Sequence, residues 1–195
     1  LAQALAITPH AVPGGYFRIG PYLGTPEDLA RFDRADQAHK KVLDWVPQAS
    51  AVPLYLTGDS GSGKSSLLNA FVLPSLRARQ WTIAEARVYQ DPESALRDAL
   101  AKLPGRRRRE GELAKLRDLI EAAAQRAADR LLLVLDQFEE FVILAEPKTK
   151  NAFSALLADL QADPVEGLRL LLVLRSDYQT ALEEIGLPPL RQQEN

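Results

Sequence analysis

A glycine-rich stretch over residues 58–66 has the residue types and spacing of a phosphate-binding loop. It contains Gly58, Asp59, Ser60, Gly61, Ser62, Gly63, Lys64, Ser65 and Ser66. The stretch matches G-x-x-x-x-G-K-[ST], in which glycines let backbone N–H groups and a helix N-terminus face phosphate oxygens. Lys64 can reach the β- and γ-phosphates, the Ser65 hydroxyl can bind Mg²⁺, and Ser66 can add a phosphate contact or helix polarity. We therefore expect a nucleoside triphosphate and Mg²⁺ here, the alternative being a flexible loop that matches by chance.

Carboxylates follow a long apolar run in the second half of the chain. Asp136 ends that run, where it can bind the Mg²⁺ directly or through water; the alternative is an exposed Asp at a strand end. Gln137 stands where many hydrolytic P-loop proteins have a catalytic glutamate, and glutamine cannot act as a base. Glu139 and Glu140 are the available replacements. One could orient and deprotonate the attacking water while the other forms a structural salt bridge.

Arg175 ends a further apolar run and is a candidate for reading the nucleotide. At the edge of a sheet its guanidinium could contact the γ-phosphate and so distinguish a triphosphate from a diphosphate. An ion pair with Asp177 or Glu139, without any nucleotide contact, is the alternative. Spacing alone leaves both interpretations open.

Apolar runs and helical spacings alternate along the chain and must position these residues. Strands are predicted at 51–57, 81–89, 130–136 and 168–177, and helices within 27–46, from the phosphate loop to Pro74, and near 92–102, 110–128 and 150–162. This order predicts an α/β fold, a three-layer sandwich with a mainly parallel sheet. In such sheets ligands bind beyond the carboxyl ends of the strands. We expect the phosphate loop, Asp136 and Arg175 to meet there.

The two ends of the sequence bear on its domain organisation. Residues 1–26 hold many Pro and Gly residues, which predict an irregular lead-in or linker, and residues 27–195 form the expected P-loop core. The sequence contains no Met, even at position 1. We therefore expect either a trimmed chain or a segment of a longer, multidomain protein.

Composition narrows the possible partners. The 24 Lys and Arg residues nearly balance the 26 Asp and Glu residues, so charge gives no reason to expect nucleic acid or an anionic membrane as partner. The absence of Cys excludes disulfides and thiolate chemistry, and the separation of His10 from His39 argues against zinc. The arginine run at 106–109 is expected to be a solvated loop. Without an apolar run of about 18 to 20 residues or a signal-peptide pattern, we expect a cytoplasmic location.

Three stretches together resemble the STAND class of signal-transduction ATPases, and in particular its bacterial novel STAND branch. They are GDSGSGKSSLLNAFVLPSLR, LLLVLDQFEEFVIL and LRLLLVLRSDY. The DQFEE element is also similar to the NACHT pattern. The resemblance implies a P-loop NTPase fold of the additional-strand type, with Walker A and Walker B motifs, Glu139 as the catalytic acidic residue and Arg175 as the sensor. The segment 32–36, FDRAD, lacks the glycine of the family's adenine-side motif.

The resemblance also implies a function. We expect a regulatory switch in signalling or defence that binds ATP with Mg²⁺ and hydrolyses it slowly. ATP would hold an assembled homo-oligomer and ADP a closed monomer, with sensor and effector domains of the parent chain as partners. The alternatives are a small-molecule kinase with the arginine run as a lid, or an interaction module with little hydrolysis, which Gln137 favours. The sequence lacks the guanine-reading Asn-Lys-x-Asp motif of GTPases and the signature of transport ATPases.

Overall fold

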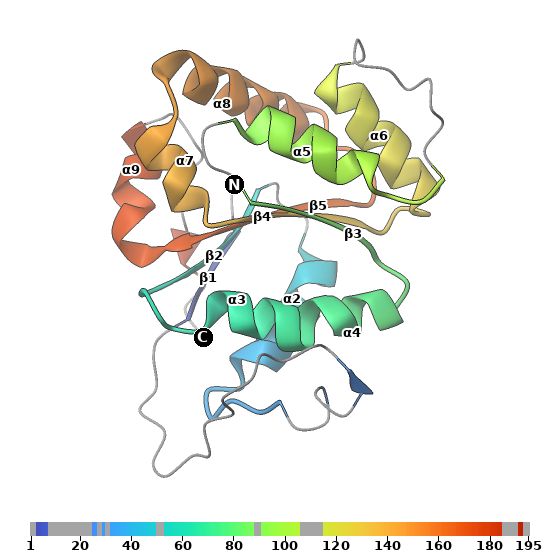
Figure 1. Ribbon diagram of the computed structural model, residues 1–195, viewed down its shortest axis with the longest axis vertical. Helices are drawn as coiled ribbons and strands as arrows, with labels where there is room; N and C mark the ends of the chain where they lie inside the picture. Colours follow the sequence, from blue (N-terminus) through green and yellow to red (C-terminus); the bar gives the residue numbers. More distant parts are fainter. Residues whose placement is uncertain are drawn as a thin grey trace.

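Six strands form one parallel sheet in the computed structural model of the chain (Figure 1). The structure describes residues 3–7, 25–26, 29, 32–49, 53–87, 91–105, 115–184 and 191–192. The strands are β1 (Gln3–Ile7), β2 (Leu54–Gly58), β3 (Thr82–Arg87), β4 (Leu131–Asp136), β5 (Leu168–Arg175) and β6 (Arg191–Gln192). Their order across the sheet is β3-β4-β5-β2-β1-β6. Every strand pair in the described residues is parallel, as expected from the alternation of strands and helices.

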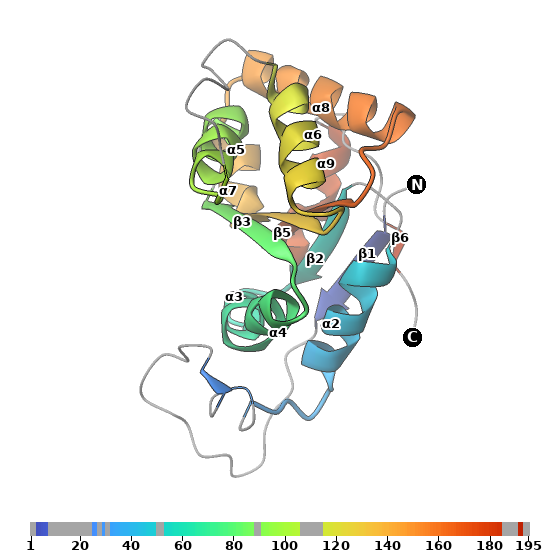
Figure 2. The same ribbon diagram turned by 90° about the vertical axis from the view of Figure 1, so that its right-hand side faces the viewer.

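Helices cover both faces of the sheet, which Figure 2 shows from its edge. One layer contains α2 (Ala38–Gln48), α3 (Lys64–Leu67), the π-helical segment η1 (Leu68–Val72) and α4 (Leu73–Ala78). The other contains α5 (Pro92–Ala101), α6 (Leu116–Arg126), α7 (Phe138–Leu144), α8 (Pro147–Ala162) and α9 (Gln179–Glu184), the last preceded by the short 3-10 turn η2 (Ser176–Tyr178). The predicted three-layer α/β sandwich is confirmed.

The central strands are apolar throughout because both of their faces are covered. In β4, Leu131 and Leu133 pack into the core beneath α5 to α9, whereas Leu132 and Val134 pack into the core with α2 to α4. All four side chains are at most 2% exposed. Burying each such side chain contributes about 1.5–3 kcal/mol. The candidate site therefore lies at the ends of strands that are held in place by the buried core.

The sheet order identifies the additional-strand type of P-loop fold. Strand β5 lies between β2, which leads into the phosphate loop, and β4, which ends in Asp136. The register aligns Gly58 with Arg175 and Leu135 with Leu172. The carboxyl ends of β2, β4 and β5 therefore meet at one edge, as predicted.

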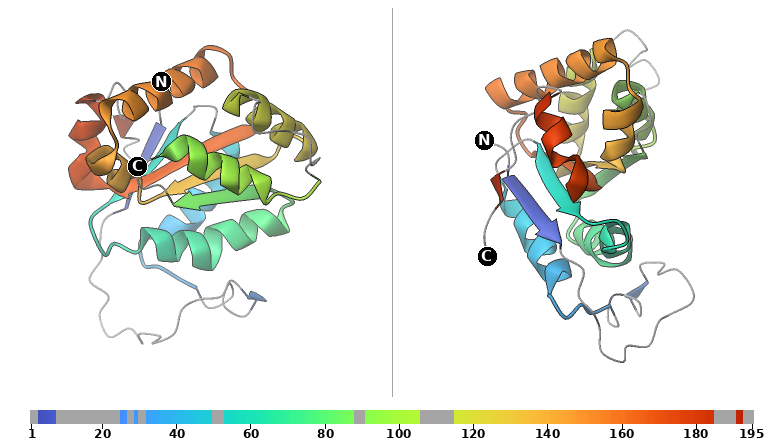
Figure 3. Two further views of the ribbon diagram at one scale, coloured as in Figure 1. Left: turned by 45° about the horizontal axis from the view of Figure 1, so that its top comes forward. Right: turned by 90° about the vertical axis from the view of Figure 1, so that its left-hand side faces the viewer.

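Strand β1 corrects the expectation of an irregular segment over residues 1–26. Gln3–Ile7 pairs in parallel with β2 and ends opposite Gly58 (Figure 3). The short run QALAI precedes the first of the breakers, Pro9, and the free edge of β2 supplies backbone partners for it. Residues 8–24 lie outside the described part of the chain.

Pro74 was expected to kink or end the helix after the phosphate loop, yet helical structure continues to Ala78. A proline lacks the N–H that would bond to the carbonyl four residues earlier, here that of Ala70. The chain widens into a π-turn just before the proline, where the N–H of Leu73 bonds to the carbonyl of Leu68. Such single π-turns accommodate local irregularities inside helices.

No helix in the described ranges is long and apolar enough to cross a membrane.

Candidate nucleotide-binding site

The phosphate loop turns sharply from the end of β2 into α3. Gly61 and Gly63 have φ values of +75° and +83°, in the left-handed region that glycine adopts without steric strain. The N–H of Ser62 donates to the carbonyl of Asp59 at 3.1 Å, which closes the turn. The backbone conformation therefore favours glycine at Gly63, which the motif requires, and also at Gly61, where the motif allows any residue.

A cavity of about 310 Å³ lies beyond the ends of β2, β4 and β5. It is lined by Ser60, Gly61, Gly63, Lys64, Ser65, Ser66, Asp136, Gln137, Glu139, Val173 and Arg175. This volume is at the lower end of the range for small-molecule sites, about 300–1,000 Å³. Of the residues predicted from the sequence, Gly58, Asp59, Ser62 and Glu140 are not part of the lining.

Lys64 lies beside both backbone carbonyls and carboxylates. Its Nζ donates to the carbonyl of Gly58 at 2.6 Å and to that of Asp59 at 3.0 Å. Burial lowers the pKa of Lys64, while the carboxylates of Glu139 and Asp136 act in the opposite direction. The ammonium group is thus held at the mouth of the phosphate loop, where an anionic ligand would be a stronger partner than neutral carbonyls.

Ser65 and Asp136 provide a pair of oxygen ligands at the same edge. The Ser65 hydroxyl donates to Asp136 Oδ2 at 3.1 Å, and the backbone N–H of Gln137 donates to Asp136 Oδ1 at 2.9 Å. Mg²⁺ prefers such hard oxygen ligands, and it commonly takes one or two protein groups together with phosphate oxygens and water. Among the described residues no group of three or more His, Cys, Asp or Glu forms a metal cluster. The donor set therefore fits Mg²⁺ bound together with a nucleotide.

Glu139 and Glu140 occupy different surroundings on α7. Glu140 Oε1 forms an ion pair with Arg87 Nη2 at 3.2 Å, at the end of β3. Glu139 instead lines the cavity. In both residues Oε2 is buried without a hydrogen-bond partner in the described part of the chain, so the two differ in the Arg87 ion pair and in the cavity contact. The two roles proposed for this acidic pair, salt bridge and attacking-water contact, thus have separate candidates.

Arg175 lines the cavity and is also paired. Its Nε and Nη2 donate to the two carboxylate oxygens of Asp177 at 3.0 and 2.6 Å, and the guanidinium lies over the ring of Tyr178. The hydrogen bonding within this pair raises the pKa of Arg175 and lowers that of Asp177. Between them, Ser176 donates to Asp59 Oδ1 at 2.5 Å. The end of β5 is therefore linked to the phosphate loop.

Arg34 is a site residue that the sequence reasoning missed. Its Nη1 donates to the carbonyl of Ser62 at 2.9 Å, and its Nε and Nη2 donate to the carboxylate of Asp36 at 3.1 and 2.8 Å. A Cβ added at Gly63 would lie 2.9 Å from Nη1. The resemblance related residues 32–36 to the family's adenine-side motif, but nothing in their spacing indicated a contact with the phosphate loop.

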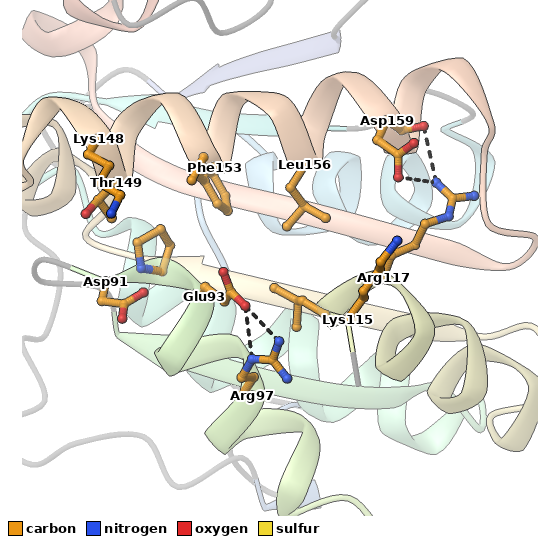
Figure 4. A pocket seen from close by; sticks show the side chains of 13 residues that line it. Asp91, Glu93, Arg97, Lys115, Arg117, Lys148, Thr149, Phe153, Leu156 and Asp159 are labelled. Atoms are coloured by element: carbon orange, nitrogen blue, oxygen red, sulfur yellow. Dashed lines mark hydrogen bonds and ion pairs between the residues drawn. The ribbon is translucent and has the colours of Figure 1, made fainter. Parts of the chain in front are cut away.

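A larger hollow of about 750 Å³ lies between α5, α6 and α8 and shares no lining residue with the phosphate cavity (Figure 4). Phe153 contributes to its apolar lining, and two ion pairs lie at its rim, Arg97 with Glu93 at 2.7 Å within α5 and Arg117 of α6 with Asp159 of α8 at 2.9 Å. No glycine is among its lining residues, so the hollow lacks the glycine-rich turn of a phosphate loop, although Lys115 and Lys148 also line it.

His39, the histidine in the described part of the chain, is not part of the lining of the phosphate cavity. His39 is buried between the rings of Phe32 and Phe71, as a packing residue. His10 and the run at 106–109 lie outside the described residues. The expectations for those segments stay predictions.

Comparisons with known proteins agree with this fold and motif set. No curated protein matches the sequence. The ORC2 protein of Aeropyrum pernix, solved as ADPNP-ADP complexes, is similar in structure, with a TM-score of 0.57 and 14% identity over 83% of this chain and 48% of that chain. A Walker-type ATPase of Pyrococcus abyssi has a TM-score of 0.57 and 15% identity over 86% of this chain and 51% of that chain.

These similarities show a shared fold, and the chain spans about half the length of either structure. The family model of Novel STAND NTPase 1 matches residues 24–194, nearly the whole chain. The resemblance drawn from the three motif stretches is thereby confirmed, and the fold and sequence agree on an NTPase domain. The chain belongs to the novel STAND NTPase 1 family.

Proposed function

We propose that this NTPase domain binds ATP together with Mg²⁺ and hydrolyses it slowly, as the nucleotide switch of a longer signalling or defence protein. The observation that carries the proposal is the convergence of Lys64, the Ser65–Asp136 pair, Glu139 and Arg175 on one cavity. Each of these groups has a distinct task in phosphoryl transfer, and together they supply the parts that P-loop ATPases require.

Binding would depend on the phosphate loop. Backbone N–H groups between Ser60 and Lys64, together with the Lys64 ammonium, would hold the β- and γ-phosphates. Ser65 and Asp136 would hold Mg²⁺, which when bound offsets the charge that develops on the phosphate oxygens. The location of these groups at the end of packed strands would keep them oriented.

Hydrolysis would use Glu139. Its carboxylate would accept a proton from a water molecule whose oxygen forms a bond to the γ-phosphorus, while the bond from that phosphorus to the bridging oxygen of ADP breaks. Glu140 is the less suitable base because its Oε1 is engaged with Arg87. Equal phosphate release by wild type and Glu139→Gln, both near background, would instead favour the second candidate, a nucleotide-binding module with little hydrolysis.

Switching would depend on Arg175. With ATP bound, its guanidinium could exchange Asp177 for the γ-phosphate, whereas ADP offers no such partner. Because η2 and α9 follow Arg175 directly, this exchange would alter the segment between β5 and β6. A ligand shifts a conformational equilibrium only through its different affinity for the two states, and the γ-phosphate contact would supply that difference. ATP would thereby favour assembly with further copies and with the other domains of the protein.

Replacing the phosphate-loop lysine tests the binding part of the proposal. Lys64→Ala should abolish ATP binding measured by calorimetry without unfolding the domain, because the burial that lowers the pKa of Lys64 offsets its hydrogen bonds to the carbonyls of Gly58 and Asp59. Lys41→Ala, at an exposed position on α2, is the matched control and should bind ATP normally. Unchanged ATP affinity in Lys64→Ala would refute the site.

A second measurement separates the switch from simple binding. Light scattering of the full-length protein should give a larger mass with ATP than with ADP. The same mass with both nucleotides would refute control of assembly and leave the ATPase assignment intact.

A further inference from the structure

Gln137 lines the candidate site although its amide cannot act as a base. It follows the Mg²⁺-binding candidate Asp136 and lines the same cavity as Lys64 and Glu139. On the basis of the proposed ATPase function, we propose that Gln137 orients the water molecule that attacks the γ-phosphate. Glu139 then takes the proton.

The backbone of Gln137 is fixed in a conformation that glutamine rarely adopts. Its φ and ψ values are +57° and +43°, in the left-handed region, which imposes a steric cost on residues other than glycine. Its N–H donates to Asp136 Oδ1 at 2.9 Å, and its carbonyl accepts the N–H of Glu140 at 2.9 Å. Such conformations persist where the surroundings hold them, and they are concentrated at functional sites. The side chain therefore leaves the backbone in a defined direction.

The Gln137 side chain has an unused acceptor. Its Oε1 is inaccessible to solvent and has no hydrogen-bond donor within the described ranges, and the same is true of Glu139 Oε2. Buried polar atoms are normally hydrogen-bonded, and leaving one unpaired is costly. Both residues line the cavity that Lys64 marks as the phosphate site. A rotation of either side chain toward the cavity would let its unpaired oxygen accept one hydrogen from a water molecule there.

A water held in this way has the orientation that hydrolysis needs. With one O–H directed to Gln137 and the other to Glu139, a lone pair of the water oxygen is free to face the γ-phosphorus. When that oxygen bonds to phosphorus and the bridging bond breaks, the proton moves to Glu139, because an amide oxygen is far too weak a base to keep it. Orientation and proton acceptance are thus divided between two side chains.

The charge around the site explains why an amide suits this position. Asp136 and Glu139 already place two carboxylates close to Lys64, and both act on its pKa. A third carboxylate at position 137 would add repulsion toward the phosphate and toward Asp136. Glutamine keeps the acceptor oxygen without adding charge, as the water-orienting glutamine of some GTPases does.

The test compares Gln137→Met, which keeps the length of the side chain and removes the acceptor, with wild type and with Gln125→Met. Gln125 is exposed on α6, so its variant controls for a change of the same type away from the site. For each protein, kcat and KM for phosphate release and the dissociation constants for ATP and ADP are measured. Retention of ADP with aluminium fluoride, which imitates the phosphoryl group in transfer, is measured alongside.

Gln137→Met should lower kcat by about 100-fold, the order of loss expected when a reacting group, here the water, is misplaced by about 1 Å. The variant should also bind ADP with aluminium fluoride no more tightly than ADP alone. Its affinities for ATP and for ADP should stay within about twofold of wild type, because no contact of Gln137 with the phosphates is proposed. Gln125→Met should match wild type in every measurement. Wild-type turnover in Gln137→Met, or a loss of ATP affinity equal to the loss of turnover, would overturn the inference.

The outcome also separates this inference from the proposed function. If wild type binds ATP but neither releases phosphate nor retains ADP with aluminium fluoride, nucleotide binding stands and the water-orienting role is refuted. If wild type binds no ATP, the proposed function fails and the inference fails with it.

Discussion

Two glycines of the phosphate loop allow a stability prediction with an internal reference. Gly61 and Gly63 both have positive φ values, +75° and +83°, so alanine at either position should destabilise the domain by about 1–2 kcal/mol. They differ in what a Cβ would contact. Among the described residues, no atom lies within 4 Å of a Cβ built at Gly61, whereas Nη1 of Arg34 lies 2.9 Å from a Cβ built at Gly63. Only Gly63→Ala should therefore disturb a neighbouring side chain.

The difference between the two variants follows from the contact of Arg34. Its head can move aside, but in doing so Nη1 leaves the carbonyl of Ser62, 2.9 Å away. A hydrogen bond from a charged donor contributes about 1.5–3 kcal/mol. The Arg34 side chain is 19% exposed and keeps its pair with Asp36, so the lower end applies. Gly63→Ala should therefore cost about 1.5 kcal/mol more than Gly61→Ala, or about 3–6 °C in Tm for a domain of this size.

Urea unfolding without nucleotide is the appropriate assay, because both glycines line the cavity and a bound ligand would mix affinity with stability. Each glycine variant is measured alone and combined with Arg34→Ala, as a double-mutant cycle. With Arg34 truncated, the excess cost of Gly63→Ala over Gly61→Ala should disappear. Equal losses at the two glycines, or an excess that persists without Arg34, would refute the reasoning.

Two other predictions concern single charges. Asp177→Asn should raise the preference for ATP over ADP, since Arg175 loses the carboxylate that competes with the γ-phosphate; an unchanged ratio of the two dissociation constants would contradict this. Burial lowers the pKa of His39 despite the opposing charge of Asp33, so the unfolded chain binds more protons as the pH falls below about 6.5. The contribution of His39 to the free energy of unfolding should be fully present above that pH and should be lost below it. The urea midpoint of wild type should therefore decrease as the pH is lowered from about 8 to 5, and His39→Gln should make this decrease smaller. The same slope in both proteins would exclude His39 as its cause.

The sequence predicted the parts of the site that depend on local pattern. Strands β4 and β5 are covered on both faces, and their apolar runs therefore stood out and ended close to Asp136 and Arg175. The sequence also indicated the turn at Gly61 and Gly63, because a tight phosphate loop needs residues that can adopt positive φ values. With parallel strands, these observations were enough to predict that the strand ends converge.

Contacts between distant segments could not be predicted in this way. Arg34 meets Ser62 across 28 positions, and Arg87 meets Glu140 across 53. Both depend on how the layers pack rather than on any periodicity in the sequence. The pairing of β1 with β2 is equally non-local, so a run of five residues before many prolines and glycines gave no adequate signal.

The present partners of the site residues suggest how ATP and ADP would differ in effect. Lys64 bonds to carbonyls and Ser65 to Asp136, contacts that a diphosphate with Mg²⁺ can already replace. Arg175 is bonded to Asp177, and only a γ-phosphate offers it an anion of comparable strength. The hydrogen bond from Ser176 to Asp59 joins the residue after Arg175 to the phosphate loop. A movement of Arg175 would therefore displace both η2 and the phosphate loop. We therefore expect the end of β5, more than the phosphate loop, to distinguish the two nucleotides.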